Sequence, residues 1–333
     1  MKTNVHTRSQ VRVKTRLLIL SDTHGQTIDT TPLNGNGIDV VIHCGDLTEH
    51  SRPAEFQTTL RLLQSLDAPL KLVIAGNHDF TLDPPVFQRK IAECERIYGE
   101  ALDNDLVQRE FGSPGESLRL LQQQAAHGID FLHEGTHTFT LANGARLQVY
   151  ASPYTPADKA SGGDDAWAFQ YAGSHRFDIA AGTDVVMTHG LPYGVMDMTA
   201  DRKRIGCPDL FAAVARAQPK LHCFGHCHNG WGAKLVAWRP QISDTPSHFS
   251  DIDNGRSRLI ASLASVKRAA DAGEEDQYAG AAFRTASYCG GDDGDEGGLV
   301  GHDGRTMMVN AALMAGDGLT QQPWVVHVDL AMA

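Results

Sequence analysis

The sequence has no long apolar run, and none of its apolar stretches approaches the roughly 20 residues that a transmembrane helix needs. Basic side chains near the start of the chain are not followed by the apolar core and small-residue cleavage site of a signal peptide. Instead, Leu17 to Leu20 lead directly into Asp22, so we interpret them as the first core strand. We therefore expect a cytoplasmic protein with no membrane partner, in which residues 1–15 form a short N-terminal extension.

Cysteine is also scarce, with six residues in a chain of 333 and no dense framework of pairs. Without a signal peptide, buried thiols are expected rather than disulfides. Cys223 and Cys227, together with His226 and His228, allow a zinc-finger interpretation. No second cysteine pair at the finger spacing supports it, so we rank it below the metal centre described in the following paragraphs.

Positive charge is limited, because 29 Lys and Arg residues face 40 Asp and Glu residues. No basic surface suggests a nucleic-acid polymer as a partner. Much of the negative charge lies from Asp271 to Asp303, where nine acidic residues and eight glycines accompany one basic residue, Arg284. We interpret this stretch as part of an exposed insertion. An Asp-rich calcium loop is the alternative, but the EF-hand order of ligands, central glycine and closing glutamate is absent.

Hydrophobic residues make up 41% of the chain and charged residues 21%, which is typical of a globular protein with a large core. Helical patterns separate the apolar runs. They open at Ser51 and Pro53, at Asp83 to Pro85 with a stop at Gly99, and at Cys207 and Pro208. Strands that alternate with helices of this length indicate βαβ units.

Later in the chain the pattern changes to strands at 138–141 and 147–150, with Asn143-Gly144 as a hairpin turn between them. Two further strands, 306–310 and 324–330, close the fold. We predict an α/β fold in which two mixed sheets pack face to face with helices outside. A single domain is expected over residues 16–333, with the acidic Gly/Asp-rich insertion at about 241–305.

Five short blocks of metal-ligand residue types are spread along the chain, and each follows a run of apolar and β-branched residues. The blocks are Asp22-Thr23-His24, Gly45-Asp46, Gly76-Asn77-His78-Asp79, Thr188-His189-Gly190 and Gly225-His226-Cys227-His228. Such runs are typical of buried strands, so the blocks are expected where strands end and loops begin. Ligands collect at the carboxyl ends of strands in α/β sheets. The sequence therefore predicts a two-metal hydrolase.

Aspartate and histidine suit borderline divalent ions such as zinc, iron, manganese or cobalt. Two such ions, roughly 3.5–4 Å apart, can clamp the attacking and leaving oxygens of a phosphoryl displacement. Asp46 is the candidate bridge, because a carboxylate has two oxygens and Gly45 lets the backbone turn tightly beside the ions. Asp22 and His24 are two residues apart and project to the same side of an extended chain. His226 and His228 can do likewise.

Asn77 and His78 of the third block are expected to have different roles. Asn77 offers a neutral amide oxygen, which limits the negative charge around an incoming anion. His78 is expected to stay off the metal and near the phosphate, where its protonated ring either stabilises the phosphate charge or donates a proton to the leaving group as the catalytic acid. Asp79 is expected to orient the His78 ring. The nucleophile is a metal-bound water, whose pKa falls to about 7 on a catalytic ion.

Each residue also has a structural interpretation. Asp22 could cap a turn, and Asn77 could occupy a Gly-Asn turn. Other histidines are expected at the surface or as hydrogen-bonded core residues; these are His43, His127, His133 and His222. The ordered set of five blocks favours the metal centre over these separate interpretations.

The five blocks resemble the pattern of the calcineurin-like metallophosphoesterase superfamily, which is Asp-x-His, Gly-Asp, Gly-Asn-His-Asp/Glu, His and Gly-His-x-His. The resemblance runs from about residue 16 to 235 and implies a four-layer αββα sandwich with a dinuclear site. It implies one ion held by Asp22, His24, Asp46 and His228. It implies a second ion held by Asp46, Asn77, His189 and His226. His78 matches the catalytic histidine of the family.

Segments outside the blocks, at 152–156, 187–192, 204–207 and 219–222, look like the metallophosphoesterase-domain-containing branch. That branch is associated with hydrolysis of cyclic nucleotides and other phosphodiesters, and some members lose activity when Gly replaces the first His of Gly-His-x-His. Here His226 is present, which favours a competent site. Protein phosphatases of the superfamily carry Asp-Arg-Gly shortly after Gly-Asp, whereas this chain has Leu47-Thr48-Glu49-His50, which argues against a phosphoprotein substrate.

We therefore expect a metal-dependent phosphodiesterase that acts on small substrates, with cyclic nucleotides leading. A phosphomonoesterase at the same site is the nearest alternative, because the two-metal clamp handles either ester. A catalytically weak member that binds a nucleotide or acts as a scaffold is the alternative of a different class.

Overall fold

The computed structural model describes residues 11–157, 167–273, 276–288 and 304–333, and it contains two large mixed sheets. The six strands of the first sheet are, in order across it, β13 (Arg284–Tyr288), β17 (Trp324–Ala331), β1 (Arg12–Leu20), β2 (Val40–His43), β3 (Leu70–Val73) and β4 (Ile129–Phe131). Strands β1 to β4 are parallel, and β17 runs antiparallel to β1. This half is the predicted βαβ region.

The second sheet has seven strands. In order across it, they are β12 (Arg258–Ser262), β11 (Gly232–Ala237), β14 (Arg305–Asn310), β10 (Leu221–Phe224), β9 (Val185–Thr188), β6 (Arg146–Ser152) and β5 (Gly135–Thr140). Its four central strands are parallel to one another. The antiparallel β5–β6 hairpin turns at Asn143-Gly144, where Gly144 has a φ of 85°, as the sequence predicts.

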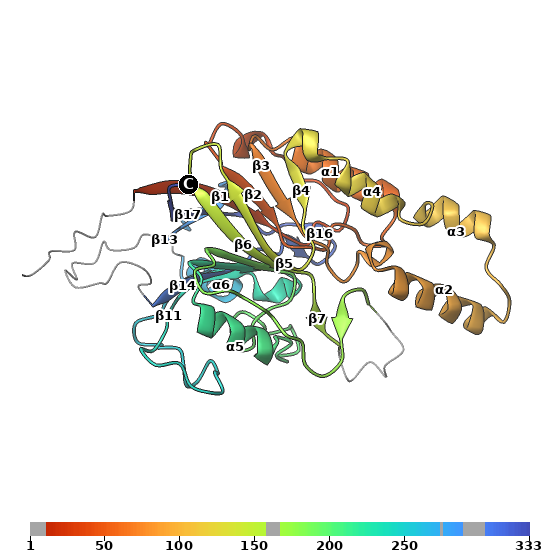
Figure 1. Cartoon of the computed structure of the whole chain (residues 1–333). Helices are drawn as coiled ribbons and strands as arrows, with labels where there is room; N and C mark the ends of the chain where they lie inside the picture. Colours follow the sequence, from red (N-terminus) through yellow and green to blue (C-terminus); the bar gives the residue numbers. More distant parts are fainter. Residues whose placement is uncertain (1–10, 158–166, 274–275, 289–303) are drawn as a thin grey trace, which may run out of the picture.

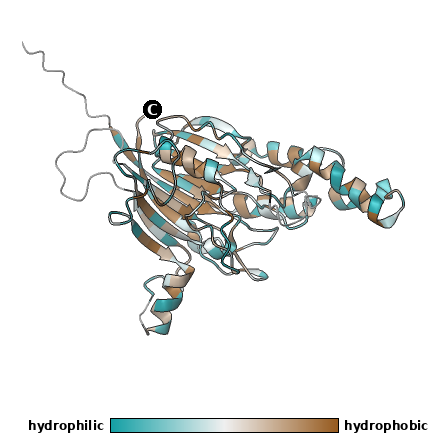
Figure 2. Cartoon of the chain, turned by 90° about the horizontal axis from the view of Figure 1, so that it is seen from below, coloured by the Kyte–Doolittle hydropathy of each residue, from teal (hydrophilic) through white to brown (hydrophobic). Residues whose placement is uncertain are grey.

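The main core lies between the two sheets. Leu17 and Ile19 of β1 pack in one apolar cluster with Val149 of β6 and Val185 of β9. Alternate residues of a strand point to opposite faces, so Leu18 and Leu20 belong to a different cluster on the outer face of the first sheet. Figure 2 shows the hydrophobic residues concentrated on the strands in the middle of the molecule.

Helices cover the outer face of each sheet and complete the αββα sandwich (Figure 1). On the first sheet, α1 (Pro53–Gln64), the helix predicted to open at Ser51 and Pro53, buries Phe56, Leu60 and Leu63. It lies beside α4 (Glu116–Gln122). On the second sheet, α5 (Pro208–Ala217) packs Phe211 and Val214 against the strands. The predicted fold class is confirmed.

The helix starts and stops follow the predicted signals. Pro84 opens α2 (Pro84–Tyr98), the Asp83 side chain accepts a hydrogen bond from the backbone N–H of Val86, and Gly99 ends the helix with a φ of 74°. The sequence prediction misses α3 (Asn104–Phe111), which buries none of its residues, and the short α4. Helices α2 and α3 extend away from the sheets in Figure 1.

The structure places residues from the predicted N-terminal extension and from the predicted insertion in the two sheets. Strand β1 begins at Arg12 and pairs with β17, so part of the expected N-terminal extension belongs to the first sheet. Within the predicted insertion at 241–305, β12 and β13 each form the edge strand of a sheet, with α6 (Leu263–Asp271) between them. The acidic glycine run at 290–298 lies outside the described residues. None of the described helices combines the length and hydrophobicity needed to cross a bilayer.

Candidate metal centre

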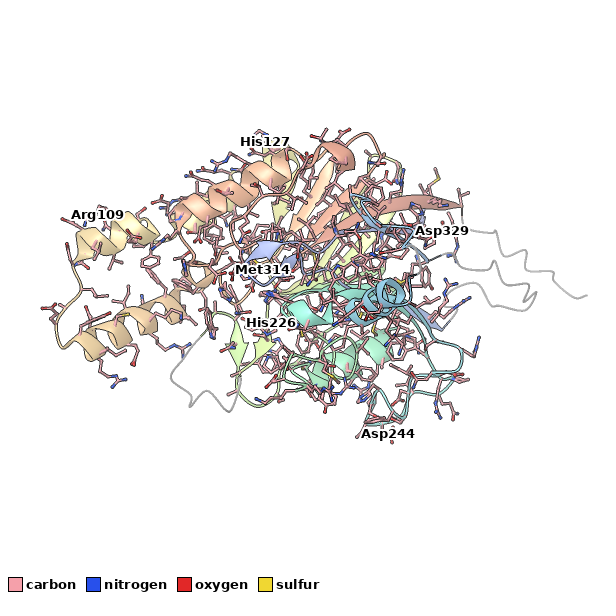
Figure 3. The ribbon with its side chains drawn as sticks, turned by 180° about the vertical axis from the view of Figure 1, so that it is seen from behind. Arg109, His127, His226, Asp244, Met314 and Asp329 are labelled. Atoms are coloured by element: carbon pink, nitrogen blue, oxygen red, sulfur yellow. The ribbon has the colours of Figure 1, made fainter. Side chains whose placement is uncertain are left out.

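All five predicted blocks follow strands whose carboxyl ends meet in one region. Asp22 and His24 follow β1, and Asp46 follows β2. Asn77 and His78 follow β3, while the remaining histidines follow β9 and β10 of the other sheet. Figure 3 shows His226 near the middle of the molecule, between its upper and lower halves. The face-to-face packing of the sheets therefore brings together residues that are distant in sequence.

Donor atoms of these residues form three overlapping groups, and within each group they lie within 4.8 Å of one another. The groups are Asp22, His24 and His228; His24, Asp46 and His78; and Asp46, His189 and His226. Every member is buried or partly buried. Carboxylate oxygen and imidazole nitrogen are the donors that borderline divalent ions accept, so the residues fit such ions.

Asp46 lies at the centre of the arrangement. Its Oδ2 atom is 3.3 Å from Nε2 of His189 and 3.8 Å from Nε2 of His24. Its Oδ1 atom accepts a hydrogen bond of 2.8 Å from the backbone N–H of His78, which fixes the orientation of the carboxylate. One carboxylate thus faces histidines from both ends of the cluster.

Asn77 lies in the same cluster, with its Oδ1 atom 2.9 Å from Nε2 of His189. On the other side of its ring, Nδ1 of His189 lies 2.8 Å from the carbonyl oxygen of Cys44 and donates to it. That bond leaves Nε2 directed at the cluster, which is how backbone carbonyls orient metal-binding histidines. All seven predicted ligands are therefore brought together.

The backbone of the cluster is strained at four of these residues. Asp22, His24, Asp46 and His226 have positive φ angles of 55°, 46°, 52° and 64°. Non-glycine residues rarely adopt this region, and each such residue costs on the order of 1–3 kcal/mol. Such strain is concentrated at functional sites, where the surrounding structure holds it in place. It supports a functional interpretation that is independent of residue type.

Two glycines allow the loops to approach one another. Gly45 has a φ of 95°, and a Cβ atom there would lie 2.7 Å from Nδ1 of His189. At Gly225, a Cβ atom would lie 2.2 Å from Oδ2 of Asp22. The backbone N–H of His226 instead donates to both oxygens of Asp22, at 3.0 and 3.1 Å. Glycine at these positions is therefore required by close packing against two predicted ligands.

Burial and neighbouring charges shift the pKa values of the residues in this cluster. Burial alone would raise the pKa of Asp22, but a hydrogen bond and the charge of His228 outweigh it and lower the pKa to about 2. Burial would lower the pKa of His189, but the Asp46 carboxylate raises it to about 9. Burial lowers the pKa of His226 to about 4. The buried carboxylates thus stay ionised and His226 stays neutral, while a metal ion would replace the proton on His189, because an imidazole must be deprotonated to ligate a metal.

His78 lies at the edge of the cluster and is one of the possible donors. Its Nδ1 atom is 2.9 Å from the backbone carbonyl oxygen of Glu49 and donates to it, so only Nε2 remains available. The predicted role of Asp79 in orienting this ring is wrong. The Asp79 carboxylate is fully buried and accepts hydrogen bonds from the backbone N–H groups of Leu47, Thr48 and Gly76, so it holds two loops of the site together.

One residue of the site was not predicted. The Oε2 atom of Glu49 lies 2.8 Å from Nδ1 of His24, on the side of the ring opposite the atom that faces Asp46. The contact lacks hydrogen-bond geometry, but the nearby carboxylate charge raises the basicity of the His24 ring, as a carboxylate beside a ligating histidine does. Glu49 belongs to the segment that follows Gly45-Asp46, but no spacing rule connects it with His24.

The four histidines that the sequence assigns to the surface or the core lie as expected. His43 and His222 are fully buried and lie 3.0 and 2.9 Å from the hydroxyl oxygens of Thr23 and Thr188. His127 and His133 are exposed. None of the donor groups found among the described residues contains a cysteine, which agrees with the low rank of the zinc-finger interpretation.

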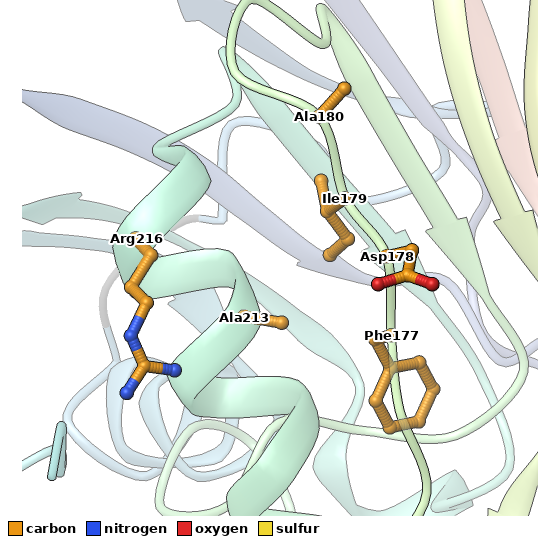
Figure 4. A pocket seen from close by; sticks show the side chains of 6 residues that line it. All are labelled: Phe177, Asp178, Ile179, Ala180, Ala213 and Arg216. Carbon is orange, nitrogen blue, oxygen red and sulfur yellow. The ribbon is translucent and has the colours of Figure 1, made fainter.

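A cavity of about 330 Å³ lies elsewhere, between residues 177–180 and α5. Figure 4 shows its lining, with Arg216 and Ala213 from the helix on one side and Phe177 on the other. It shares no residue with the donor groups. The metal centre, rather than this pocket, is the candidate functional site.

A family model for the calcineurin-like phosphoesterases matches residues 15–230 of the chain. The chain belongs to this family. The resemblance stated from the sequence is thereby confirmed, and membership supports a metal-dependent phosphoester hydrolase. The match covers all five blocks of this calcineurin-like phosphoesterase and ends beyond His228.

Curated relatives of this phosphoesterase match about two thirds of the chain. It is 32% identical over 225 residues to metallophosphoesterase domain-containing protein 1 of Homo sapiens, covering 66% of this chain and 62% of the human protein. It is 32% identical over 228 residues to probable rhamnogalacturonate lyase C of Emericella nidulans, covering 67% of this chain and 18% of that protein. A UPF0046 protein of Caenorhabditis elegans is 29% identical over 227 residues, covering 65% of this chain and 52% of that protein. The matched region is thus less than two thirds of each relative.

Proposed function

We propose that this chain hydrolyses small phosphodiesters at a centre of two divalent metal ions, with cyclic nucleotides as the leading substrates. The observation that carries the proposal is the shared position of Asp46, which belongs to two donor groups. Asp22, His24, Asp46 and His228 would hold one ion, and Asp46, Asn77, His189 and His226 would hold the other. Manganese, iron, zinc and cobalt all accept this mixture of oxygen and nitrogen donors.

Such ions, when bound, polarise the phosphoryl oxygens and activate a water for attack. The protein holds their ligands in place through the Cys44 carbonyl, the Glu49 carboxylate and the buried Asp79. His78 would donate a proton to the leaving oxygen from Nε2, since its Nδ1 atom is engaged by the Glu49 carbonyl. This hydrogen bond supports the role of His78 as the proton donor, because it leaves Nε2 as the ring nitrogen that points away from the loop.

Two features support a small substrate. The segment after Gly45-Asp46 lacks the Asp-Arg-Gly of the protein phosphatases, and Glu49 within it contacts His24. The 32% identity to metallophosphoesterase domain-containing protein 1 agrees with the branch that the sequence resembles. A phosphomonoesterase at the same centre is the second candidate, because the donor arrangement itself is suited to either ester.

The test uses the purified full chain with added manganese and two chromogenic esters, bis(p-nitrophenyl) phosphate and p-nitrophenyl phosphate. Metal-dependent turnover of the diester is expected, followed by a survey of cyclic nucleotides. Exclusive turnover of the monoester would contradict the diesterase proposal. Tight nucleotide binding by metal-loaded protein that hydrolyses neither ester would favour a catalytically weak binding member.

A further inference from the structure

Trp167 packs against His78, although 89 positions separate the two residues and no motif connects them. The ring centroids lie 4.5 Å apart, with an interplanar angle of 37°. On another side of His78, the ring of His24 makes an edge contact with a centroid distance of 4.7 Å. The His78 ring is thus bordered by a predicted metal ligand and by an indole.

The backbone next to Trp167 is tied to the predicted catalytic loop. The N–H of Ala168 donates to the carbonyl oxygen of Asn77 at 3.1 Å. The N–H of Phe169 donates to Oδ2 of Asp83 at 2.9 Å, the same side chain that caps α2. These two bonds place the indole next to His78 through the main chain rather than through chance side-chain contact.

Phe169, beside Trp167, has an unusual backbone conformation. Its φ is 53°, in the left-handed region that bulky residues seldom adopt. A residue held in such a conformation indicates that the surrounding contacts over-determine it, and such residues cluster at functional sites. Together with the four strained residues of the metal cluster, Phe169 marks the Trp167 segment as part of the site.

The indole is also supported from α2. Nζ of Lys90 lies 4.7 Å from the centroid of the Trp167 ring and 5.1 Å from that of Phe80. Contacts of a cation with an aromatic face stabilise the position of the ring. Lys90 thus contacts the indole from a helix that begins at Pro84, just beyond the predicted catalytic loop.

We propose that Trp167 is a positioning residue that keeps the His78 imidazole aimed at the leaving oxygen. This inference rests on the proposed function, in which His78 donates a proton. The Glu49 carbonyl fixes Nδ1, but one hydrogen bond leaves the ring free to tilt about it. The indole blocks that tilt by occupying the space beside the ring. Misplacement of a catalytic group by about 1 Å is enough to lower a rate by two orders of magnitude.

The chemical step defines what loss of Trp167 should change. A water oxygen forms a bond to phosphorus, the bond from phosphorus to the leaving oxygen breaks, and the water loses a proton to solvent. The proton on Nε2 of His78 passes to the leaving oxygen. A p-nitrophenolate leaves readily without that proton, whereas a phenolate needs it, so the need for a well-aimed His78 grows with the basicity of the leaving group.

The experiment compares metal-loaded wild type, Trp167→Ala, Trp167→Phe and His78→Ala on diesters with p-nitrophenyl and phenyl leaving groups. For Trp167→Ala we expect kcat to fall about 10-fold or more with the phenyl ester and less than about threefold with the p-nitrophenyl ester. KM should stay within about twofold, and Trp167→Phe should restore most of the phenyl activity. Tyr98→Ala, which removes an exposed aromatic residue at the end of α2, is the matched control and should match wild type.

Four outcomes would overturn the inference. A rise in KM with unchanged kcat would make Trp167 a substrate-binding residue. An equal loss of kcat on both esters, with unchanged metal content and thermal unfolding, would make its role independent of proton donation. If His78→Ala discriminates between the esters and Trp167→Ala does not, this inference alone fails. If His78→Ala does not discriminate either, the proton-donor role of His78 fails and this inference fails with it.

Discussion

The Nε2 atoms of His24 and His228 lie 3.4 Å apart, although 204 positions separate the residues in the sequence. Carboxylates flank the pair, with Oδ1 of Asp22 3.4 Å from His228 and Oδ2 of Asp46 3.8 Å from His24. Burial lowers the pKa of His24, which favours the neutral ring that ligates a metal. Two imidazole nitrogens and two carboxylates that converge in this way are best explained by a shared cation.

His78→Ala should retain the bound metal while activity falls by about 10²–10⁴-fold, because only the proton donor is removed. Metal content by elemental analysis and kcat on bis(phenyl) phosphate measure the two effects separately. His133→Ala, at an exposed histidine outside the cluster, is the control and should leave both unchanged. An unchanged rate in His78→Ala would remove its assigned role.

Glu49→Gln should weaken metal binding by about 10–100-fold, the usual effect of changing a charged partner of a ligating histidine. The substitution removes the charge of the Oε2 atom beside Nδ1 of His24, and the Glu49 backbone carbonyl that holds His78 remains. Titration of the metal-free protein with manganese measures the affinity. Glu100→Gln, at an exposed glutamate, serves as the control. Equal affinity in Glu49→Gln and wild type would show that the carboxylate has no role in holding the ligand.

Gly225→Ala should disrupt metal binding at the Asp22 end of the cluster. The added Cβ atom would lie 2.2 Å from Oδ2 of Asp22 and 2.0 Å from Oγ of Ser21, so the loop has to move. Gly318→Ala is a suitable control, because its Cβ atom would have no neighbour nearer than 4.0 Å. Metal content and the thermal midpoint should both fall in Gly225→Ala and stay unchanged in Gly318→Ala. Full metal content in Gly225→Ala would contradict the close packing described for this loop.

His222 should make the metal-free protein less stable in acid. Burial lowers its pKa in the folded state from 6.5 to about 3, so between these values the unfolded chain binds more protons. The stability that neutral His222 contributes is therefore fully present above pH 6.5. As the pH falls below this value, the free energy of unfolding decreases by up to about 1.4 kcal/mol for each pH unit. Urea unfolding of His222→Gln in the presence of chelator should show a shallower loss of stability between pH 6.5 and 4.5 than wild type. Parallel curves for the two proteins would contradict this assignment.

The sequence predicts which side chains meet at the candidate site, because each block is local in the chain. Each block places its ligands at the end of an apolar strand, and parallel strands of one sheet end at a common edge. The two halves of the cluster meet because the sheets pack face to face, which brings Nε2 of His24 to 3.4 Å from Nε2 of His228. Most of what the sequence predicts about the site therefore comes from the types of the ligand residues and from their positions at the ends of strands.

The supporting contacts are less predictable because they depend on loop geometry. Glu49 and Trp167 contact His24 and His78 through loops whose paths no periodicity describes. The predicted role of Asp79 is wrong because its carboxylate bonds to backbone N–H groups of another loop instead of the ring of the adjacent His78. Its carboxylate turns toward the backbone of Leu47 and Thr48, away from the ring of His78. Helix α3 escapes prediction for another reason, since it buries no residue and leaves no apolar face in the core.

The central claim is that Asp46 bridges two metal ions, and the most direct test is the metal stoichiometry of wild type and Asp46→Asn. Elemental analysis of the manganese-reconstituted chain, with activity measured on the same samples, should give two ions per chain for wild type. Asp46→Asn should lose metal and activity together, because the neutral amide supplies one oxygen in place of two. One ion per wild-type chain, or two ions retained in Asp46→Asn, would contradict a dinuclear centre bridged by this carboxylate.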